Sequence, residues 1–180
     1  MANYNPVVIN KVLELGKNVL RINDLKSFQK DVLTGLVQGR DVLLAYPTGS
    51  GKSAIYQLFP FVKEICDNIL LGHEGTVPTN YASKYMALVV QPLISLMKDQ
   101  ITSMQQRNIS AARLQSEKEL QNKRTRPSTE TVEDDVRKCT IMLASPEAVL
   151  EPHRELFKSD LVQDRIVCVC IDESHCIVKW

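Results

Sequence analysis

The sequence predicts an α/β domain in which helices cover both faces of a parallel sheet. Four short apolar runs, each about six residues long, lack the alternation of polar and apolar residues that marks a half-exposed strand. They lie at residues 41–46, 86–91, 139–144 and 166–171. Stretches with helical spacing of apolar residues separate them, and this alternation is typical of a doubly wound parallel sheet.

The helical stretches follow from the spacing of apolar residues at intervals of three and four. Helices are expected at residues 53–68 and 93–107, with a shorter one at 155–162, and two amphipathic helices at 7–20 and 27–38 precede the first strand. Two regions are expected to be loops. Residues 72–83 contain glycines and a proline, and residues 115–138 are rich in charge.

Size and composition describe an ordinary globular chain. Its 180 residues suit one domain with a proper core, and 44% hydrophobic and 24% charged residues are unexceptional. The net charge of +1 gives no global attraction to phosphate, so charge neither supports nor excludes nucleic acid as a partner. No apolar run approaches the roughly 20 residues that span a bilayer, and the N-terminus lacks the pattern of a secretory signal. We expect no membrane partner.

The five cysteines are odd in number and irregularly spaced, which favours reduced thiols inside a cell. Cys168, Cys170, His175 and Cys176 could together suggest a zinc cluster. However, zinc sites of this kind use ligand pairs at characteristic spacings, and two such pairs are missing. We therefore interpret Cys168 and Cys170 as small apolar residues of a strand.

One motif points to phosphate binding. Pro47-Thr48-Gly49-Ser50-Gly51-Lys52-Ser53 follows an expected strand and opens an expected helix. Its glycines let the backbone curl so that several N–H groups face one anion, and the helix N-terminus adds positive potential there. Lys52 can then reach the outer phosphates of a nucleotide, and the Ser53 hydroxyl can bind Mg²⁺. The first glycine of the general pattern is replaced by Tyr46.

A second motif places two carboxylates after an apolar run. Val169-Cys170-Ile171 is followed by Asp172 and Glu173, at the end of a strand where α/β folds bind ligands. An isolated Asp-Glu pair is usually a solvated turn. Together with the upstream phosphate loop it predicts a nucleotide-hydrolysis site, in which Asp172 holds Mg²⁺ and Glu173 polarises the attacking water.

Several further stretches follow one another in a recognisable order. Between residues 25 and 58 they are Leu25-Lys26-Ser27-Phe28-Gln29, the phosphate loop and Tyr56-Gln57-Leu58. Residues 91–100 read QPLISLMKDQ, and Ala144-Ser145-Pro146-Glu147 and Asp172-Glu173-Ser174-His175-Cys176, with Trp180 after them, come later in the chain. This ordered set resembles the RecQ family of superfamily 2 helicases, and its most specific stretch, residues 91–100, resembles motif Ia of that family.

The resemblance implies roles for individual residues. Gln29 matches the glutamine that reads adenine, and Lys26 stands where the family usually has an arginine near the base. His175 belongs to the hydrolysis motif together with Asp172 and Glu173. Pro92, Leu93, Ser95 and Lys98 match the region that follows the tracked DNA strand.

By this resemblance, the cofactors are ATP and Mg²⁺, and the partner is DNA with a single-stranded tail and a duplex junction. Residues 1–24 would form a helical extension, and residues 25–180 an incomplete first RecA-like lobe. The second lobe, with its arginine finger, would lie outside this sequence. The expected activity is ATP-driven 3′ to 5′ DNA unwinding in replication, recombination and repair, in the nucleus of a eukaryote or the nucleoid of a bacterium. An RNA helicase of the same superfamily and a nucleotide-binding fragment without motor activity are the alternatives.

Overall fold

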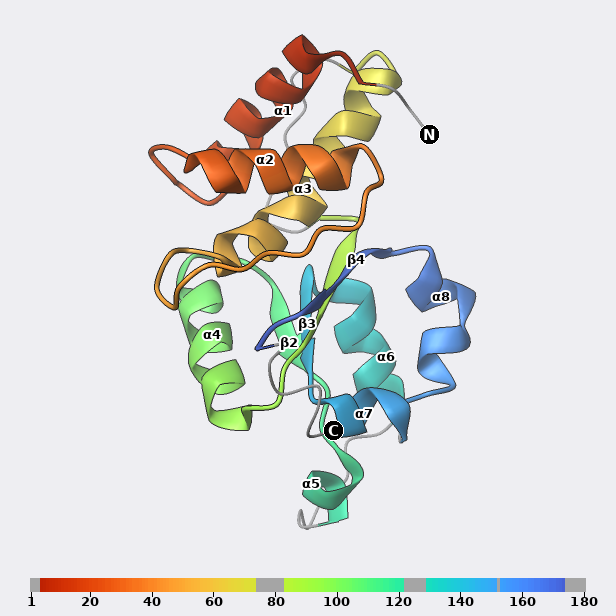
Figure 1. Ribbon diagram of the computed structural model, residues 1–180. Coiled ribbons are helices and arrows are strands. Elements are labelled where there is room, and N and C mark those ends of the chain that lie inside the picture. Colours follow the sequence, from red (N-terminus) through yellow and green to blue (C-terminus); the bar gives the residue numbers. More distant parts are fainter. Residues whose placement is uncertain (1–3, 74–82, 122–128, 152, 174–180) are drawn as a thin grey trace. The chain divides into compact units, whose positions relative to one another are not determined.

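A computed structural model describes residues 4–73, 83–121, 129–151 and 153–173. The chain divides into two compact units, residues 1–83 and 84–180, and each is described by itself. The first unit contains three helices among its described residues: α1 (Pro6–Val19), α2 (Ser27–Val37) and α3 (Ser53–Leu70). The second contains a parallel sheet with its covering helices. Both units are shown in Figure 1.

The three helices of the first unit pack through their apolar faces. Asn5 caps α1, because its side-chain oxygen accepts from the Val7 N–H at 3.0 Å. A Cβ added to Gly16 would lie 2.9 Å from Cγ2 of Val62, so the glycine permits the close approach of α1 to α3. The core is formed by Val12, Leu13, Leu33, Leu58, Phe61, Val62 and Ile65, all nearly or fully buried.

The second unit is built on a four-stranded sheet with the order β2-β3-β1-β4, and all of its pairings are parallel. Its strands are β1 (Met86–Val90), β2 (Ala111–Arg113), β3 (Ile141–Ala144) and β4 (Ile166–Ile171). The sheet with its flanking helices confirms the predicted α/β class. Among the described strands, β4 pairs only with β1, and Val169 and Ile171 are 59% and 49% exposed.

Helices cover both faces of this sheet. Figure 1 shows α4 (Ile94–Gln106) on one side and α6 (Thr129–Lys138) and α8 (Asp160–Gln163) on the other. Shorter elements complete the unit: α5 (Glu117–Gln121), α7 (Pro146–Leu150) and the 3₁₀ turn η2 (Leu156–Lys158). Alternate residues of each strand face opposite helical layers.

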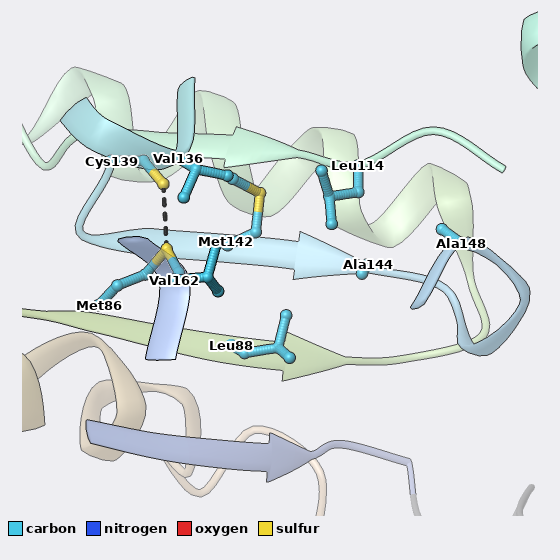
Figure 2. Close-up of a cluster of buried hydrophobic side chains, with 9 residues drawn as sticks. All are labelled: Met86, Leu88, Leu114, Val136, Cys139, Met142, Ala144, Ala148 and Val162. Carbon is cyan, nitrogen blue, oxygen red and sulfur yellow. Dashed lines mark hydrogen bonds between the residues drawn. The ribbon is translucent and has the colours of Figure 1, made fainter. Parts of the chain in front are cut away.

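One layer of the core is shown in Figure 2, where strand residues meet the helices of one face. The cluster consists of Met86, Leu88, Leu114, Val136, Cys139, Met142, Ala144, Ala148 and Val162. Within it the Cys139 thiol donates to the sulfur of Met86 at 3.5 Å. Burial raises the pKa of the Cys139 thiol to about 12, so the group stays protonated at neutral pH.

Three sequence predictions for secondary structure were wrong. Residues 41–46 form no strand in the described structure, since they pair with no other strand, and Leu43 is 92% exposed. Residues 115–138 were predicted to be a loop, yet α5 and α6 lie within them. The helix predicted at 155–162 is divided into η2 and α8, because the extended backbone of Ser159 (ψ 143°) separates the two.

Candidate nucleotide and nucleic-acid sites

The phosphate loop leads directly into α3, which begins at Ser53. Two of its glycines have left-handed backbone angles, with φ of 78° at Gly49 and 97° at Gly51. Side-chain-bearing residues rarely adopt these angles, so the sequence pattern has a local geometric cause. A Cβ on Gly51 would also lie 3.0 Å from Nε2 of Gln29. Thr48, Gly49, Ser50, Gly51 and Lys52 form a continuous turn that ends where α3 begins at Ser53, although the strand predicted before this loop is absent from the described structure.

Lys52 folds back over its own loop. Its ammonium donates to the backbone oxygens of Tyr46 at 2.8 Å and Pro47 at 3.0 Å. Both acceptors belong to the residues that begin the loop, so the charge is held at the loop rather than extended into solvent. Ser50 adds a polar atom without a match, because its Oγ is buried and has no hydrogen-bond partner in the described structure.

Lys26, the N-cap residue of α2, and Gln29, in its first turn, contact the loop. The Gln29 side-chain oxygen accepts from the Lys26 N–H at 2.9 Å, and its Nε2 donates to the Gly51 carbonyl at 2.8 Å. The Lys26 ammonium donates to the carbonyl of Ser50 at 2.8 Å. The structure thus brings Gln29 and Lys26 to the phosphate loop, 22 and 24 residues away in sequence.

An aromatic contact at the same place was missed by the sequence analysis. The rings of Phe28 and Tyr46 stack with centroids 4.1 Å apart and planes 22° apart. The sequence did offer a signal, because Tyr46 occupies the position of the first glycine in the general phosphate-loop pattern.

The acidic pair lies at the carboxyl end of β4, in the second unit. The Asp172 N–H donates to the Val90 carbonyl at 3.0 Å and so continues the β1–β4 pairing. The Asp172 carboxylate accepts from the Glu173 N–H at 3.0 Å. Glu173 has a φ of 55°, a left-handed angle that is uncommon for a residue with a side chain. Strain of this kind tends to occur at functional sites, and it turns the chain directly after the strand.

Not every residue of the hydrolysis motif falls within the described structure. His175 lies outside the described residues, as do Cys176 and Trp180. The thiols of Cys168 and Cys170 are described, and burial raises the pKa of each to about 12. Both residues lie within β4, which fits their interpretation as strand residues. The described part of the chain contains no group of histidine, cysteine and acidic residues that could hold a metal.

The residues expected to face nucleic acid lie at the start of α4. Pro92 and Leu93 form the link between β1 and the helix, and Leu93 is 53% exposed. Ser95 and Lys98 are exposed one helical turn apart, whereas Met97 and Met104 bury the opposite face. Because the Asp172 N–H donates to the carbonyl of Val90, the residue directly before Gln91, this link begins at the same carboxyl end of the sheet as Asp172.

Gln91 holds this link in place, a role that the sequence analysis did not assign. Its side chain is fully buried, and Nε2 donates to Oε1 of Gln100 at 2.9 Å. The contact joins the end of β1 to the middle of α4. The pair could have been noticed in the sequence, because the two glutamines begin and end the residue 91–100 stretch.

The fold and the phosphate loop define a P-loop α/β protein, and comparison with known families places it further. The family model for DEAD/DEAH box helicases matches residues 26–180, and the chain belongs to that family. Within the family it is RecQ-like. It is 32% identical to ATP-dependent DNA helicase Q-like 2 of Arabidopsis thaliana, over 91% of this chain and 20% of that protein.

Other relatives agree. ATP-dependent DNA helicase RecQ of Synechocystis sp. is 33% identical over 84% of this chain and 27% of its own length. ATP-dependent DNA helicase Q1 of Rattus norvegicus is 28% identical over 94% of this chain and 24% of its own length. The chain therefore spans between 20% and 27% of the length of these three relatives.

No helix in the described part of the chain is both long and apolar enough to cross a membrane.

Proposed function

We propose that this chain is the ATP-binding lobe of a DNA helicase that moves 3′ to 5′ and unwinds DNA during replication, recombination and repair. The observation that carries the proposal is the arrangement at the start of α3. There Gly49 and Gly51 curve the phosphate loop, Lys52 is held at it, and Gln29 is bonded to its Gly51 carbonyl. Its site of action would be the nucleus in a eukaryote and the nucleoid in a bacterium.

The residues of the first unit suit the phosphates of ATP. The loop offers N–H groups at the N-terminus of α3, where an anion is stabilised. The buried, unpartnered Ser50 Oγ is a polar atom that a ligand or its water shell would satisfy. Lys52 would exchange its two carbonyl partners for phosphate oxygens, a stronger charge-assisted contact.

Mg²⁺ would be held by oxygen ligands, which that ion prefers. The Ser53 hydroxyl and the Asp172 carboxylate are the candidates, with Asp172 acting through water. Bound Mg²⁺ neutralises charge that develops on the transferred phosphoryl group. Glu173 would accept the proton of the attacking water, and His175 would complete the hydrolysis motif.

Gln29 would read the adenine edge, since its amide both donates and accepts. In the structure both amide atoms are engaged, by Lys26 and Gly51, so base recognition would require at least one of these bonds to be exchanged. Lys26 lacks the planar guanidinium that stacks on a base, and its contact with the Ser50 carbonyl suits a supporting role.

DNA would bind along Pro92, Leu93, Ser95 and Lys98. The exposed face of α4 supplies a cation and a hydroxyl for the phosphate backbone, and Leu93 supplies an apolar surface. The relatives named above are DNA helicases, which favours DNA over RNA as the nucleic acid.

The proposal can be tested by equilibrium binding of a fluorescent ATP analogue with Mg²⁺. The unmodified chain should bind, and Lys52→Ala should bind at least tenfold more weakly, because a lysine–phosphate pair near the surface is worth several kcal/mol. Lys138→Ala is the matched control, since it removes the same charge from an exposed ion pair with Asp134. Equal binding by wild type and Lys52→Ala would contradict the proposal.

The choice of nucleic acid needs a separate measurement. Competition between single-stranded DNA and RNA of the same sequence for the full-length protein should favour DNA. The Lys98→Ala variant should weaken binding and reduce its salt dependence, because one phosphate contact is lost. Preference for RNA would support the alternative of an RNA helicase.

A further inference from the structure

Tyr46, at the beginning of the phosphate loop, contacts a folded element through its ring. Before it, residues 41–45 form no helix or strand, and Leu43 is 92% exposed. The Tyr46 ring is 46% exposed and stacks on Phe28, which is 8% exposed and belongs to α2. The ring contact therefore links a segment without regular structure to an anchored helix.

The end of the loop is held by the same helical turn. Lys26 and Gln29 donate to the consecutive carbonyls of Ser50 and Gly51, each at 2.8 Å. Phe28 lies between these two residues in sequence and contacts the other end of the loop. The first turn of α2 thus fixes both ends of the loop, one through an aromatic stack and the other through hydrogen bonds.

The aromatic stack also bears on the position of the lysine. The Lys52 ammonium donates to the carbonyls of Tyr46 and Pro47, so its place depends on the backbone at these two residues. A glycine at residue 46 would have no ring to fix this peptide and would have a wider choice of backbone angles. Here the Tyr46 ring restricts the peptide that accepts from Lys52.

We infer that Tyr46 is a positioning residue for nucleotide binding: by stacking on Phe28 it holds the start of the phosphate loop and orients Lys52. This inference rests on the proposed function. It deepens that function by adding a residue that acts on phosphate through the loop and the lysine. A pre-organised loop loses less conformational freedom when phosphate binds, so the ring contributes to affinity without touching the ligand.

The test compares Tyr46→Ala with Tyr46→Phe in the 180-residue chain. Two properties are measured: the Kd of a fluorescent ATP analogue with Mg²⁺, and hydrogen exchange of the amides at residues 48–53. Removing one aromatic pair should weaken nucleotide binding by roughly 3- to 10-fold and speed amide exchange. Tyr46→Phe keeps the ring and should restore both. Tyr85→Ala, a tyrosine of the other unit, is the control and should match wild type.

A double-mutant cycle identifies the partner. Phe28→Leu keeps an apolar side chain in the core while removing the ring, and in that background Tyr46→Ala should have little further effect. A Tyr46→Ala effect as large in the Phe28→Leu background as in wild type would overturn the role of the stack. Circular dichroism melting of each variant checks that α1, α2 and α3 remain folded.

The possible outcomes distinguish a failure of this inference from a failure of the proposed function on which it rests. If wild type binds nucleotide while Tyr46→Ala binds equally well with unchanged exchange, the inference is overturned and the proposed function stands. If wild type binds no nucleotide, the proposed function is overturned, and amide exchange alone decides the positioning role. Faster exchange in Tyr46→Ala that Tyr46→Phe reverses would then support it, and unchanged exchange would overturn it.

Discussion

Glu173 combines a carboxylate at the end of β4 with a left-handed backbone, φ 55°, directly after Asp172. A residue placed in this way is oriented by the turn as well as by its own rotamer. We expect Glu173→Gln in the full-length protein to leave the Kd for ATP within about twofold and to lower turnover by about 10²–10⁴. Glutamine keeps the shape of the side chain but cannot accept a proton.

Steady-state ATP hydrolysis with DNA present, alongside nucleotide binding, measures this effect. Glu151→Gln, directly after α7, removes an exposed carboxylate and serves as the control. Loss of ATP binding with the hydrolysis rate retained would assign Glu173 to metal holding or structure, and would make Asp172 the candidate base.

Cys139 gives the molecule a dependence of stability on alkaline pH. Burial raises the pKa of its thiol from the ordinary 9.0 to about 12, so the folded chain retains a proton that the unfolded chain loses above pH 9. Stability from this group is complete below pH 9 and falls as the pH rises towards 12, by at most about 1.4 kcal/mol per pH unit. Urea unfolding of wild type and Cys139→Ala between pH 8 and about 10.5 should show a shallower decline in the variant. Parallel declines would show that other groups are responsible.

At the scale of the elements, Arg165 joins three parts of the second unit just before β4. Its guanidinium donates to the carbonyls of Lys84 at 3.0 Å, Cys139 at 2.9 Å and Val136. These acceptors lie before β1, at the end of α6 and before β3. One side chain therefore satisfies backbone oxygens that helix and strand termini leave without partners.

We expect Arg165→Met to lower the free energy of unfolding by about 3 kcal/mol, because hydrogen bonds from a charged donor are lost and the carbonyls are left unmatched. The free energy of unfolding of Arg165→Lys should lie between those of wild type and Arg165→Met, since an ammonium cannot donate in all three directions that the planar guanidinium reaches. Arg137→Met, an exposed residue at the end of α6, should change stability little. Denaturant unfolding gives all three values, and equal stability of Arg165→Met and wild type would contradict the role of Arg165.

A helix or strand could be predicted from the sequence where its own residues carry a clear pattern. Strands β1, β3 and β4 and helices α1 to α4 carry runs or faces of apolar residues, and their positions were predicted to within a few residues. β2 is Ala-Ala-Arg, too short and too small in its side chains to stand out. Residues 41–46 have the composition of a strand, but a strand also needs a neighbour with which to pair, and that is not a local property.

The site was predictable in the same uneven way. The glycines and Lys52 indicate a phosphate loop by themselves, because they lie together in one short stretch of the sequence. In contrast, the bonds from Lys26 and Gln29 to the loop span more than 20 residues and depend on how α2 packs beside it. The spacing of apolar residues does not predict such contacts. The role of Gln29 was therefore suggested by the resemblance to a family and not by the sequence pattern.

At the scale of the whole molecule, the chain spans only 20–27% of its RecQ-like relatives named above. We propose that the helicase works through two lobes that close around ATP and open again, and that this chain supplies residues of one of them. We expect the 180-residue chain to bind Mg-ATP weakly and not to separate a 3′-tailed duplex. A strand-separation assay with purified chain tests this, with the full-length protein as positive control. ATP-dependent unwinding by the monomeric chain would contradict the need for two lobes.

The outer side of β4 has a practical consequence for anyone who handles this chain. Among the described strands, β4 has no neighbour on its outer side, and its backbone groups there, next to the exposed Val169 and Ile171, can template another copy's strand. The intensity of scattered light should therefore rise more steeply than in proportion to the protein concentration. Val169→Lys should suppress that growth, because neighbouring copies would then repel one another, while Val7→Lys, at a 73% exposed position on α1, should not. If the scattering of wild type stays proportional to the protein concentration, the edge of β4 does not promote association. Crystallisation trials could then proceed at high concentration.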